Sequence, residues 1–140
     1  MSAKFFLDTN IFVYSFDDRN RIKQKKAQSL IDTALAERSG LISTQVIQEF
    51  LNVALRKFDK PLSVQEGRSY LDVVLTPLCE VFPTAKLYQH ALELKAETGF
   101  AFYDSLIIAS ALSTNCKVLY TEDLQNNQRI ADLIIKNPFL

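Results

Sequence analysis

Four acidic residues of this 140-residue chain stand at places where the surrounding pattern is apolar. Asp8 directly follows the short apolar run 5–7, and Asp123 comes shortly after a second apolar run, 118–120. Glu49 and Asp104 lie beside apolar residues on two segments with helical periodicity. Burying an unpaired carboxylate in such surroundings costs free energy, so each acid needs a partner, an ion or the edge of a cleft.

Carboxylates that converge repel one another, and this repulsion restricts the chemistry that they can perform. Two unit charges about 4 Å apart cost about 4 kcal/mol at an effective dielectric constant of about 20. Protons or a divalent cation must therefore neutralise such a cluster. Ligands that are all oxygen atoms suit Mg²⁺ or Mn²⁺ better than zinc. The reaction that needs this arrangement is displacement at a phosphate by a water that the metal activates.

Each acid taken alone also has a structural interpretation. Asp104 can favour the positive N-terminal end of its helix, and Asp123 is a common type of turn residue. Glu49 falls about 60° from Val46 around its helix, on the flank of the apolar stripe. Strand ends and helix starts share one edge of a parallel α/β sheet, and we therefore expect the four acids to converge there.

The segments that would position these acids form an alternating pattern. Short apolar runs alternate with amphipathic stretches, which predicts a small α/β domain with a central parallel sheet. Asn10 is the expected N-cap of the first helix, and Gly40 is the expected end of the second. The predicted strands are 5–7, 41–42, 78–82 and 117–120, with 130–136 ambiguous. The predicted helices are 11–16, 27–38, 44–57, 63–75, 84–98 and 103–114.

Length and composition predict one globular domain that covers residues 1–140. Sixteen Lys and Arg residues balance sixteen Asp and Glu residues. The absence of net positive charge argues against a protein that binds nucleic acid over most of its surface. Cys79 and Cys116 have no CxxC spacing, so neither a zinc site nor a disulfide framework is expected. Because no apolar run approaches the ~18 residues of a membrane span, we expect a cytoplasmic protein with no membrane contact.

Four segments around these acids resemble the PIN-domain family, in particular its VapC-like toxin ribonucleases. The resemblance extends over residues 4–136, with the motifs in the family's order. They are Phe6-Leu7-Asp8-Thr9-Asn10, Gln45-Val46-Ile47-Gln48-Glu49-Phe50, Phe102-Tyr103-Asp104-Ser105-Leu106-Ile107-Ile108-Ala109-Ser110-Ala111 and Leu119-Tyr120-Thr121-Glu122-Asp123-Leu124. The resemblance implies a PIN-like three-layer α/β/α sandwich with a small central parallel sheet and a metal-dependent endoribonuclease site.

The resemblance also implies which residues and partners serve that site. The family's catalytic, metal-binding acids correspond to Asp8, Glu49, Asp104 and Asp123. Its supporting polar positions correspond to Thr9, Asn10 and Thr121. The implied cofactor is Mg²⁺ or Mn²⁺, and the implied substrate is RNA. As the toxin of a type II toxin–antitoxin pair, the chain would form a homodimer and bind a cognate antitoxin.

Three points leave alternatives open. Many toxins of this family carry an Asn and then a later Asp after the last strand, whereas Glu122 and Asp123 are adjacent here, so either can be the fourth acid. A PIN fold can also be a non-catalytic module that binds RNA or protein, although retention of all four mutually repelling acids weighs against this. The basic segment 19–26 is either a patch for RNA phosphates or a solvated loop and helix start.

Overall fold

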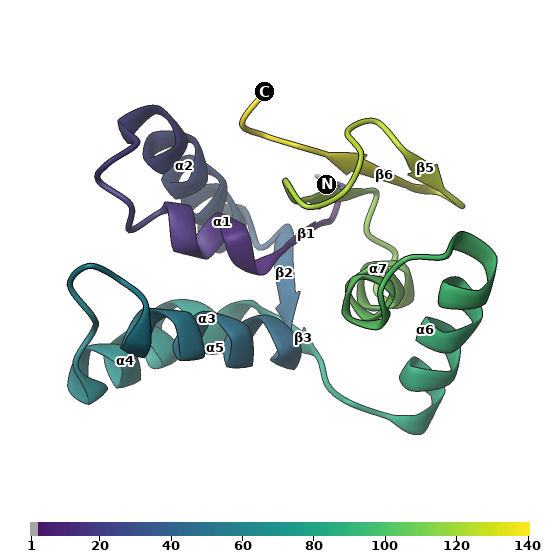
Figure 1. Ribbon diagram of the computed structural model, residues 1–140, viewed down its shortest axis with the longest axis horizontal. Coiled ribbons are helices and arrows are strands. Elements are labelled where there is room, and N and C mark those ends of the chain that lie inside the picture. The colour runs from purple at the N-terminus through teal and green to yellow at the C-terminus, as the bar shows by residue number, and fades with distance from the viewer. Residues whose placement is uncertain (1–2) are drawn as a thin grey trace.

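A six-stranded sheet forms the centre of the computed structural model, which describes residues 3–140 (Figure 1). Its strands lie in the order β3-β2-β1-β4-β6-β5. All neighbouring strands run parallel except β5, which pairs antiparallel with β6. The strands are β1 Phe5–Leu7, β2 Gly40–Ser43, β3 Cys79–Val81, β4 Val118–Tyr120, β5 Arg129–Ile130 and β6 Leu133–Lys136.

Helices cover both faces of this sheet. In Figure 1, helices α1 to α5 lie on one side and α6 and α7 on the other. Right-handed crossovers require this division, because the chain moves from β1 through β2 to β3 and then returns past β1 to β4. The predicted α/β fold class is thereby confirmed. The helices are α1 Thr9–Tyr14, α2 Arg21–Glu37, α3 Thr44–Arg56, α4 Val64–Tyr70, the π-helical turn Leu71–Leu75, α5 Thr76–Leu78, α6 Ala85–Thr98 and α7 Phe102–Ser113.

The start of α1 differs from the predicted one. Asp8, and not Asn10, is the N-cap, and the helix begins at Thr9. Both residue types are good caps, so local preference alone does not choose between them. The choice follows from the sheet, because Asp8 is already tied to β4 through a hydrogen bond from its N–H to the carbonyl of Tyr120 (3.1 Å).

The bounds of α2 also differ from those predicted. The polar segment before residue 27 is already helical, because the side chain of Asn20 caps the helix by accepting from the N–H of Lys23. Gly40 does not end the helix. Arg38 is its C-cap, in a left-handed conformation (φ 53°), and Gly40 begins β2. A Cβ on Gly40 would lie 2.3 Å from the Cβ of Ala34, so α2 packs against β2 at a distance that only glycine allows.

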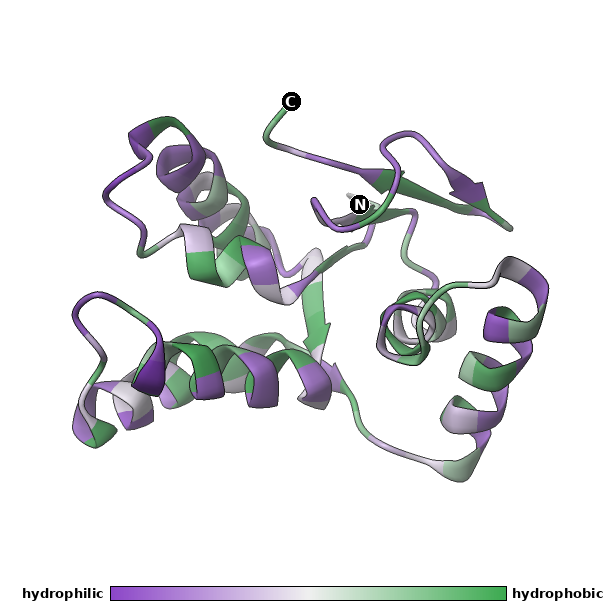
Figure 2. Ribbon diagram, in the orientation of Figure 1, coloured by the Kyte–Doolittle hydropathy of each residue, from purple (hydrophilic) through white to green (hydrophobic). Residues whose placement is uncertain are grey.

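The hydrophobic core lies between the sheet and its two helical layers. Phe6, Leu7 and Leu119 on the central strands are fully buried. Every residue from Ser105 to Ala111 on α7 is buried, because this helix lies between the sheet and α6. Figure 2 shows the hydrophobic composition along β2. Within residues 3–140, no helix is both long and apolar enough to cross a bilayer.

An aromatic cluster fixes the helices that carry half of the predicted site. Phe50 on α3 lies at its centre, with ring centroids 6.2 Å from Phe12, 5.7 Å from Phe16 and 5.1 Å from Tyr70. These contacts hold α1 against α3 and α4, and aromatic pairs at such distances stabilise beyond their buried area. Since Glu49 precedes Phe50, the cluster also fixes where Glu49 lies relative to α1.

Candidate active site

The carboxyl ends of β1 and β4 meet at the point where the strand order reverses. Leu7 pairs with Tyr120, so the residues that follow the two strands are neighbours. From β1 the chain crosses over to β2 on one side, whereas β4 lies on the other side. In open α/β sheets, such a switch point is where ligands bind. Asp8 and Thr121 are the first residues beyond the two strands at this point.

Asp8 is buried at this point, with only 6% of its surface exposed. Its Oδ1 accepts from the N–H of Thr9 (2.7 Å), and its Oδ2 accepts from Oγ1 of Thr121 (2.8 Å). Burial raises the pKa of Asp8 to about 7, the two hydrogen bonds oppose this rise, and the charges of Asp123 and Glu49 add to it. A carboxyl group held in this way gains its charge near neutral pH or when a cation binds.

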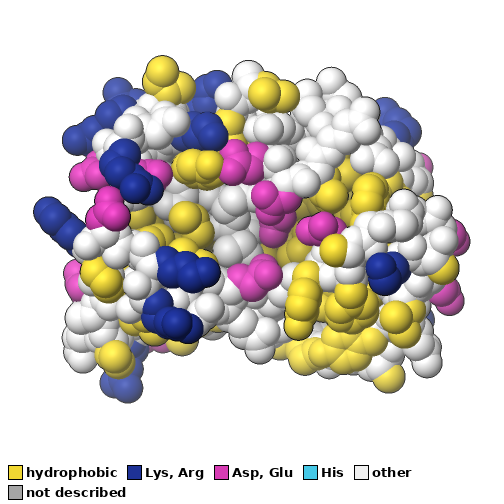
Figure 3. Space-filling view, viewed as in Figure 1, with side chains coloured by type: hydrophobic (Ala, Val, Ile, Leu, Met, Phe, Trp, Pro, Cys, Tyr) yellow, Lys and Arg dark blue, Asp and Glu magenta, His cyan; other side chains and the backbone are white. Residues whose placement is uncertain are grey.

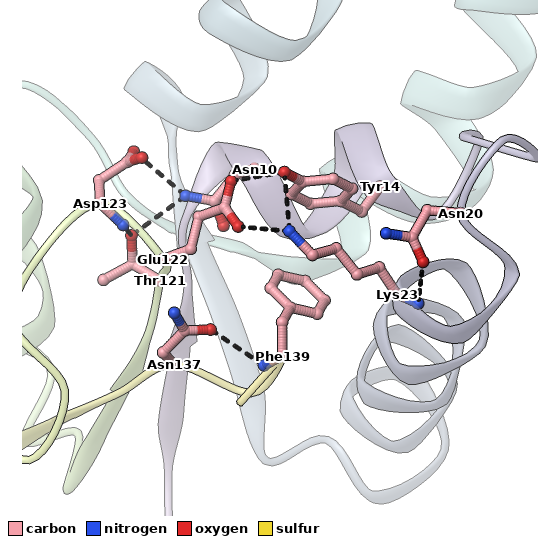
Figure 4. Close-up of polar contacts among 9 residues, drawn as sticks. All are labelled: Asn10, Tyr14, Asn20, Lys23, Thr121, Glu122, Asp123, Asn137 and Phe139. Atoms are coloured by element: carbon pink, nitrogen blue, oxygen red, sulfur yellow. Dashed lines mark hydrogen bonds and ion pairs between the residues drawn. The ribbon is translucent and has the colours of Figure 1, made fainter.

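The predicted supporting residues hold two of the other acids. Oγ1 of Thr9 donates to Oε1 of Glu49 (2.7 Å). Nδ2 of Asn10 donates to both Oγ1 of Thr121 and Oδ2 of Asp123, each at 3.1 Å (Figure 4). The first turn of α1 therefore links Asp8 to α3 on one side and to the loop after β4 on the other.

Asp104 lies in the first turn of α7, and Ala101 is the N-cap of that helix. The pKa of Asp104 is raised, first by desolvation and then by the charges of Asp123 and Glu49. The contributions of Asp123 and Glu49 to this rise agree with the position of Asp104 in the same hollow as these two acids. The position in the first turn also agrees with a favourable interaction with the helix dipole, so the two interpretations of Asp104 are compatible.

All four predicted acids line one hollow of about 590 Å³. Figure 3 shows acidic side chains gathered in the hollowed centre of this face. The hollow is also lined by Arg19 and Tyr103, and the Tyr103 side chain is largely exposed. A negatively charged depression of this size at a strand switch point suits a hydrated divalent cation and part of a polar substrate.

The chemistry of these donors fits a hard divalent cation, although the side chains stand apart. In the conformation described for residues 3–140, no three Asp, Glu, His or Cys side chains are close enough together to hold an ion. The donors in the hollow are carboxylate oxygens, which Mg²⁺ and Mn²⁺ prefer. Oδ1 of Asn10 is in addition a buried oxygen without a hydrogen-bond partner among the described residues. Mg²⁺ usually keeps several waters, which allows ligands that are farther apart than in a closed cage.

Glu122 lines the same hollow, but both of its oxygens have partners outside this group of acids. Turn alternation suggests that its side chain points to solvent, but this expectation is wrong. Its Oε1 accepts from the hydroxyl of Tyr14 (2.6 Å), and its Oε2 lies 3.2 Å from Nζ of Lys23 (Figure 4). The hydrogen bond to Glu122 is the main cause that raises the pKa of Tyr14, and the hydrogen bonds to Tyr14 and then to Glu122 raise the pKa of Lys23. No sequence signal connects residues so far apart, which is why the sequence does not predict this contact.

Of the two candidates for the fourth acid, only Asp123 faces the others. It accepts from Asn10 and contributes to the raised pKa values of Asp8 and Asp104. The basic segment 19–26 is partly used within the chain. Arg19 pairs with Asp17 (3.0 Å) and Asp59 (3.4 Å), and Lys23 pairs with Glu122.

Residues 5–132 of the chain match the PIN domain family. The chain therefore belongs to this family, and its α/β fold with a mostly parallel sheet is that of a PIN domain. A comparison with curated proteins found no match.

Solved structures similar to this chain include VapC toxins from toxin–antitoxin systems. VapBC2 from Rickettsia felis, bound to a DNA fragment from its promoter, is 26% identical over 95% of this chain and 97% of that chain, with a TM-score of 0.62. A toxin–antitoxin complex from Klebsiella pneumoniae is 17% identical over 98% of each chain, with a TM-score of 0.68. VapC20 from Mycobacterium tuberculosis, which cleaves the sarcin–ricin loop, is 18% identical over 86% of this chain and 92% of that chain, with a TM-score of 0.58.

Proposed function

We propose that this chain is a Mg²⁺- or Mn²⁺-dependent endoribonuclease and the toxin of a type II toxin–antitoxin pair. The observation that carries the proposal is the hollow at the strand switch point, which is lined by Asp8, Glu49, Asp104 and Asp123. Membership of the PIN domain family and the likeness to VapBC2, at 26% identity, support the toxin assignment. VapC20, which is similar in structure, cleaves the sarcin–ricin loop, and this supports RNA as the substrate.

The four acids would hold the cation, and the residues around them orient their oxygens. Thr121 and the N–H of Thr9 fix both oxygens of Asp8, while Thr9 and Asn10 fix Glu49 and Asp123. When bound, the cation would supply the positive charge that activates a water and stabilises the leaving oxygen at the scissile phosphate. Tyr103, with 65% of its surface exposed at the rim, is placed to stack on an unpaired base.

The first experiment asks whether the purified chain cuts RNA and whether the cut needs metal. We expect cleavage of RNA with Mn²⁺, none with EDTA, and none by Asp104→Asn under either condition. Cleavage that persists in EDTA or in Asp104→Asn would exclude this site as its source. RNA binding without cleavage by the wild type would favour the alternative of a non-catalytic binding module.

We extend the proposal to two protein partners, a cognate antitoxin and a second copy of the chain. The antitoxin is supported by the neighbouring structures, several of which are toxin–antitoxin complexes. An antitoxin that occupies the hollow should bring positive charge, because the charged residues that line the hollow are six acids and one arginine. Co-purification with the product of the adjacent gene tests the first partner. Light scattering of the purified chain tests the second.

Mn²⁺ should raise the melting temperature of the wild type and leave that of Asp8→Asn almost unchanged. A ligand that binds only the folded state at about ten times its dissociation constant adds about 1.4 kcal/mol to the free energy of unfolding. For a chain of this size that corresponds to a shift of about 3–6 °C. Because few carboxylates hold the cation, millimolar Mn²⁺ should be needed. Thermal scans with and without Mn²⁺ measure the shift, and an equal shift in both proteins would place the ion elsewhere.

Asp123→Asn should slow single-turnover cleavage at saturating Mn²⁺ by about tenfold or more, less than Asp8→Asn, because water can replace one ligand of the cation. Glu122→Gln should change the saturated rate by less than about threefold, because Glu122 faces Tyr14 and Lys23 rather than the hollow's other acids. The two substitutions are matched, since each removes one negative charge from adjacent residues. If Glu122→Gln proves the slower variant, Glu122 is the fourth acid and Asp123 is not.

A further inference from the structure

Glu122 is adjacent in sequence to a candidate metal-binding acid, yet both of its oxygens are engaged elsewhere (Figure 4). Nζ of Lys23 donates to Oε2 of Glu122 (3.2 Å) and to the hydroxyl oxygen of Tyr14 (3.3 Å). Tyr14 in turn donates to Oε1 of Glu122 (2.6 Å). Tyr14, Lys23 and Glu122 thus form a closed triangle of contacts, which we call the Glu122 anchor. It connects α1, α2 and the loop after β4.

The Glu122 anchor is partly shielded from water. Nζ of Lys23 lies 4.5 Å from the ring centroid of Tyr14 and 5.4 Å from that of Phe139. The rings of Tyr14 and Phe139 pack edge to face at 4.8 Å. The side chains of Lys23 and Glu122 are only 30% and 25% exposed. An ion pair of this kind, with a cation over two rings and a shared hydroxyl, is more strongly held than an isolated pair on an open surface.

The loop that carries Asp123 is therefore held from two sides. On one side Glu122 is held by the anchor. On the other, the N–H of Asp123 donates to Oγ1 of Thr121 (3.1 Å), and its Oδ2 accepts from Asn10 (3.1 Å). The adjacent side chains of this loop thus have different partners: Glu122 contacts Tyr14 and Lys23, and Asp123 contacts Asn10 (Figure 4). Releasing Glu122 would remove the contact that ties this part of the loop to α1 and α2, while the backbone bonds of Thr121 and Asn127 to β6 would remain.

We propose that Lys23 and Tyr14 are positioning residues that act through Glu122 to hold Asp123 in place for binding of the divalent cation. The inference rests on the proposed function, because it takes Asp123 to be a metal ligand. It makes a prediction opposite in sign to that of simple electrostatics. Removing the positive charge of Lys23 near a cation site should tighten cation binding by Coulomb's law, whereas loss of the anchor should weaken it.

The test is the Mn²⁺ concentration that gives half of the maximal rise in melting temperature, measured without RNA. In Lys23→Met this concentration should increase about fivefold, which corresponds to the loss of about 1 kcal/mol. Methionine keeps an apolar stem beside the rings of Tyr14 and Phe139, so the melting temperature in EDTA should change little. Lys23→Arg retains the charge and should stay within about twofold of the wild type, because an arginine can also pair with a carboxylate. Lys26→Met is the matched control, since it removes the same charge from an exposed position on α2.

A double-mutant cycle separates positioning from charge. If Lys23 acts only through Glu122, then adding Lys23→Met to Glu122→Gln should not weaken Mn²⁺ binding further. Tyr14→Phe removes one bond of the anchor and should show a smaller loss than Lys23→Met, and it decides the matter if Lys23→Met fails to fold. Unchanged or tighter Mn²⁺ binding in a folded Lys23→Met protein would overturn this inference alone. If the wild type itself shows no response to Mn²⁺, the proposed metal site fails and the inference fails with it.

Discussion

Asp8→Asn should reduce the rate of RNA cleavage by about a hundredfold or more. The same substitution should make the metal-free protein more stable at neutral pH. The loss of activity follows because Asp8 is the most buried of the four acids and lies at the strand switch point. An effect of this size is what removing a group that stabilises transition-state charge produces. The gain in stability follows because the substitution removes a buried charge that Asp123 and Glu49 repel. Asparagine can still accept from the N–H of Thr9 as the N-cap of α1.

The stability of the metal-free wild type should fall as the pH rises from about 4 to about 7. The pKa of Asp8 is raised from 3.8 to about 7 in the folded chain. Between these values the folded chain binds more protons than the unfolded chain, so the free energy of unfolding decreases with pH, by at most about 1.4 kcal/mol per unit. Above pH 7 Asp8 is ionised in both states and its contribution to the slope vanishes.

Melting curves in EDTA at several pH values test both statements. The wild type should lose more stability over this range than Asp8→Asn, in which only the raised pKa of Asp104 still acts in the same direction, so the two curves should separate most near pH 7 and above. Asp8→Ala is the control that removes the same charge and also the cap, and it should gain less stability than Asp8→Asn. If Asp8→Asn melts below the wild type at pH 8 or still cuts RNA, the role assigned to Asp8 is wrong.

The sequence predicts the relative placement of the acids better than it predicts local contacts. Asp8 and the loop around Asp123 follow the apolar strands β1 and β4, and the carboxyl ends of parallel strands necessarily share an edge. The positions of Glu49 and Asp104 near the same edge follow from the helical periodicity of their segments once a parallel sheet is assumed. The roles of these residues stay predictions, but their position around one hollow is a consequence of strand and helix patterns that a single sequence carries.

Features that depend on residues distant in sequence could not be predicted. Asp8 rather than Asn10 caps α1 because of a bond to β4. Glu122 turns toward Lys23, which is 99 residues away. The antiparallel β5–β6 hairpin turns through Ala131, which has φ 52°. Alanine rarely adopts this conformation, and the Gly or Asn that usually indicates such a turn is absent at this position. In each case a contact between distant parts of the chain selects the conformation. Local sequence preference either does not distinguish this conformation from others or disfavours it.

Gly40→Val should destabilise the fold by about 3 kcal/mol, although valine is a strong strand former and Gly40 begins β2. A Cβ at this position would lie 2.3 Å from Cβ of Ala34 and 2.7 Å from Cε2 of Phe5. The Phe5 ring can turn aside. Ala34 cannot, because its Cβ moves only with the backbone of α2, so helix and strand must separate. Strand propensity alone predicts the opposite sign, which makes chemical denaturation of this variant a direct test of the packing.

The contact with Ala34 can be isolated with a smaller side chain and a compensating change. Gly40→Ala should cost about 1–3 kcal/mol through the same clash. Ala34→Gly alone should cost about 1 kcal/mol, the penalty of glycine within a helix. Combined, the two should destabilise by clearly less than the sum of the single effects, because Ala34→Gly removes the nearest atom that the added methyl group would meet. Additive effects would mean that Phe5, and not the approach of α2 to β2, sets the cost. Because Ser43 of the same strand is the N-cap of α3, this packing also determines where the helix that carries Glu49 begins.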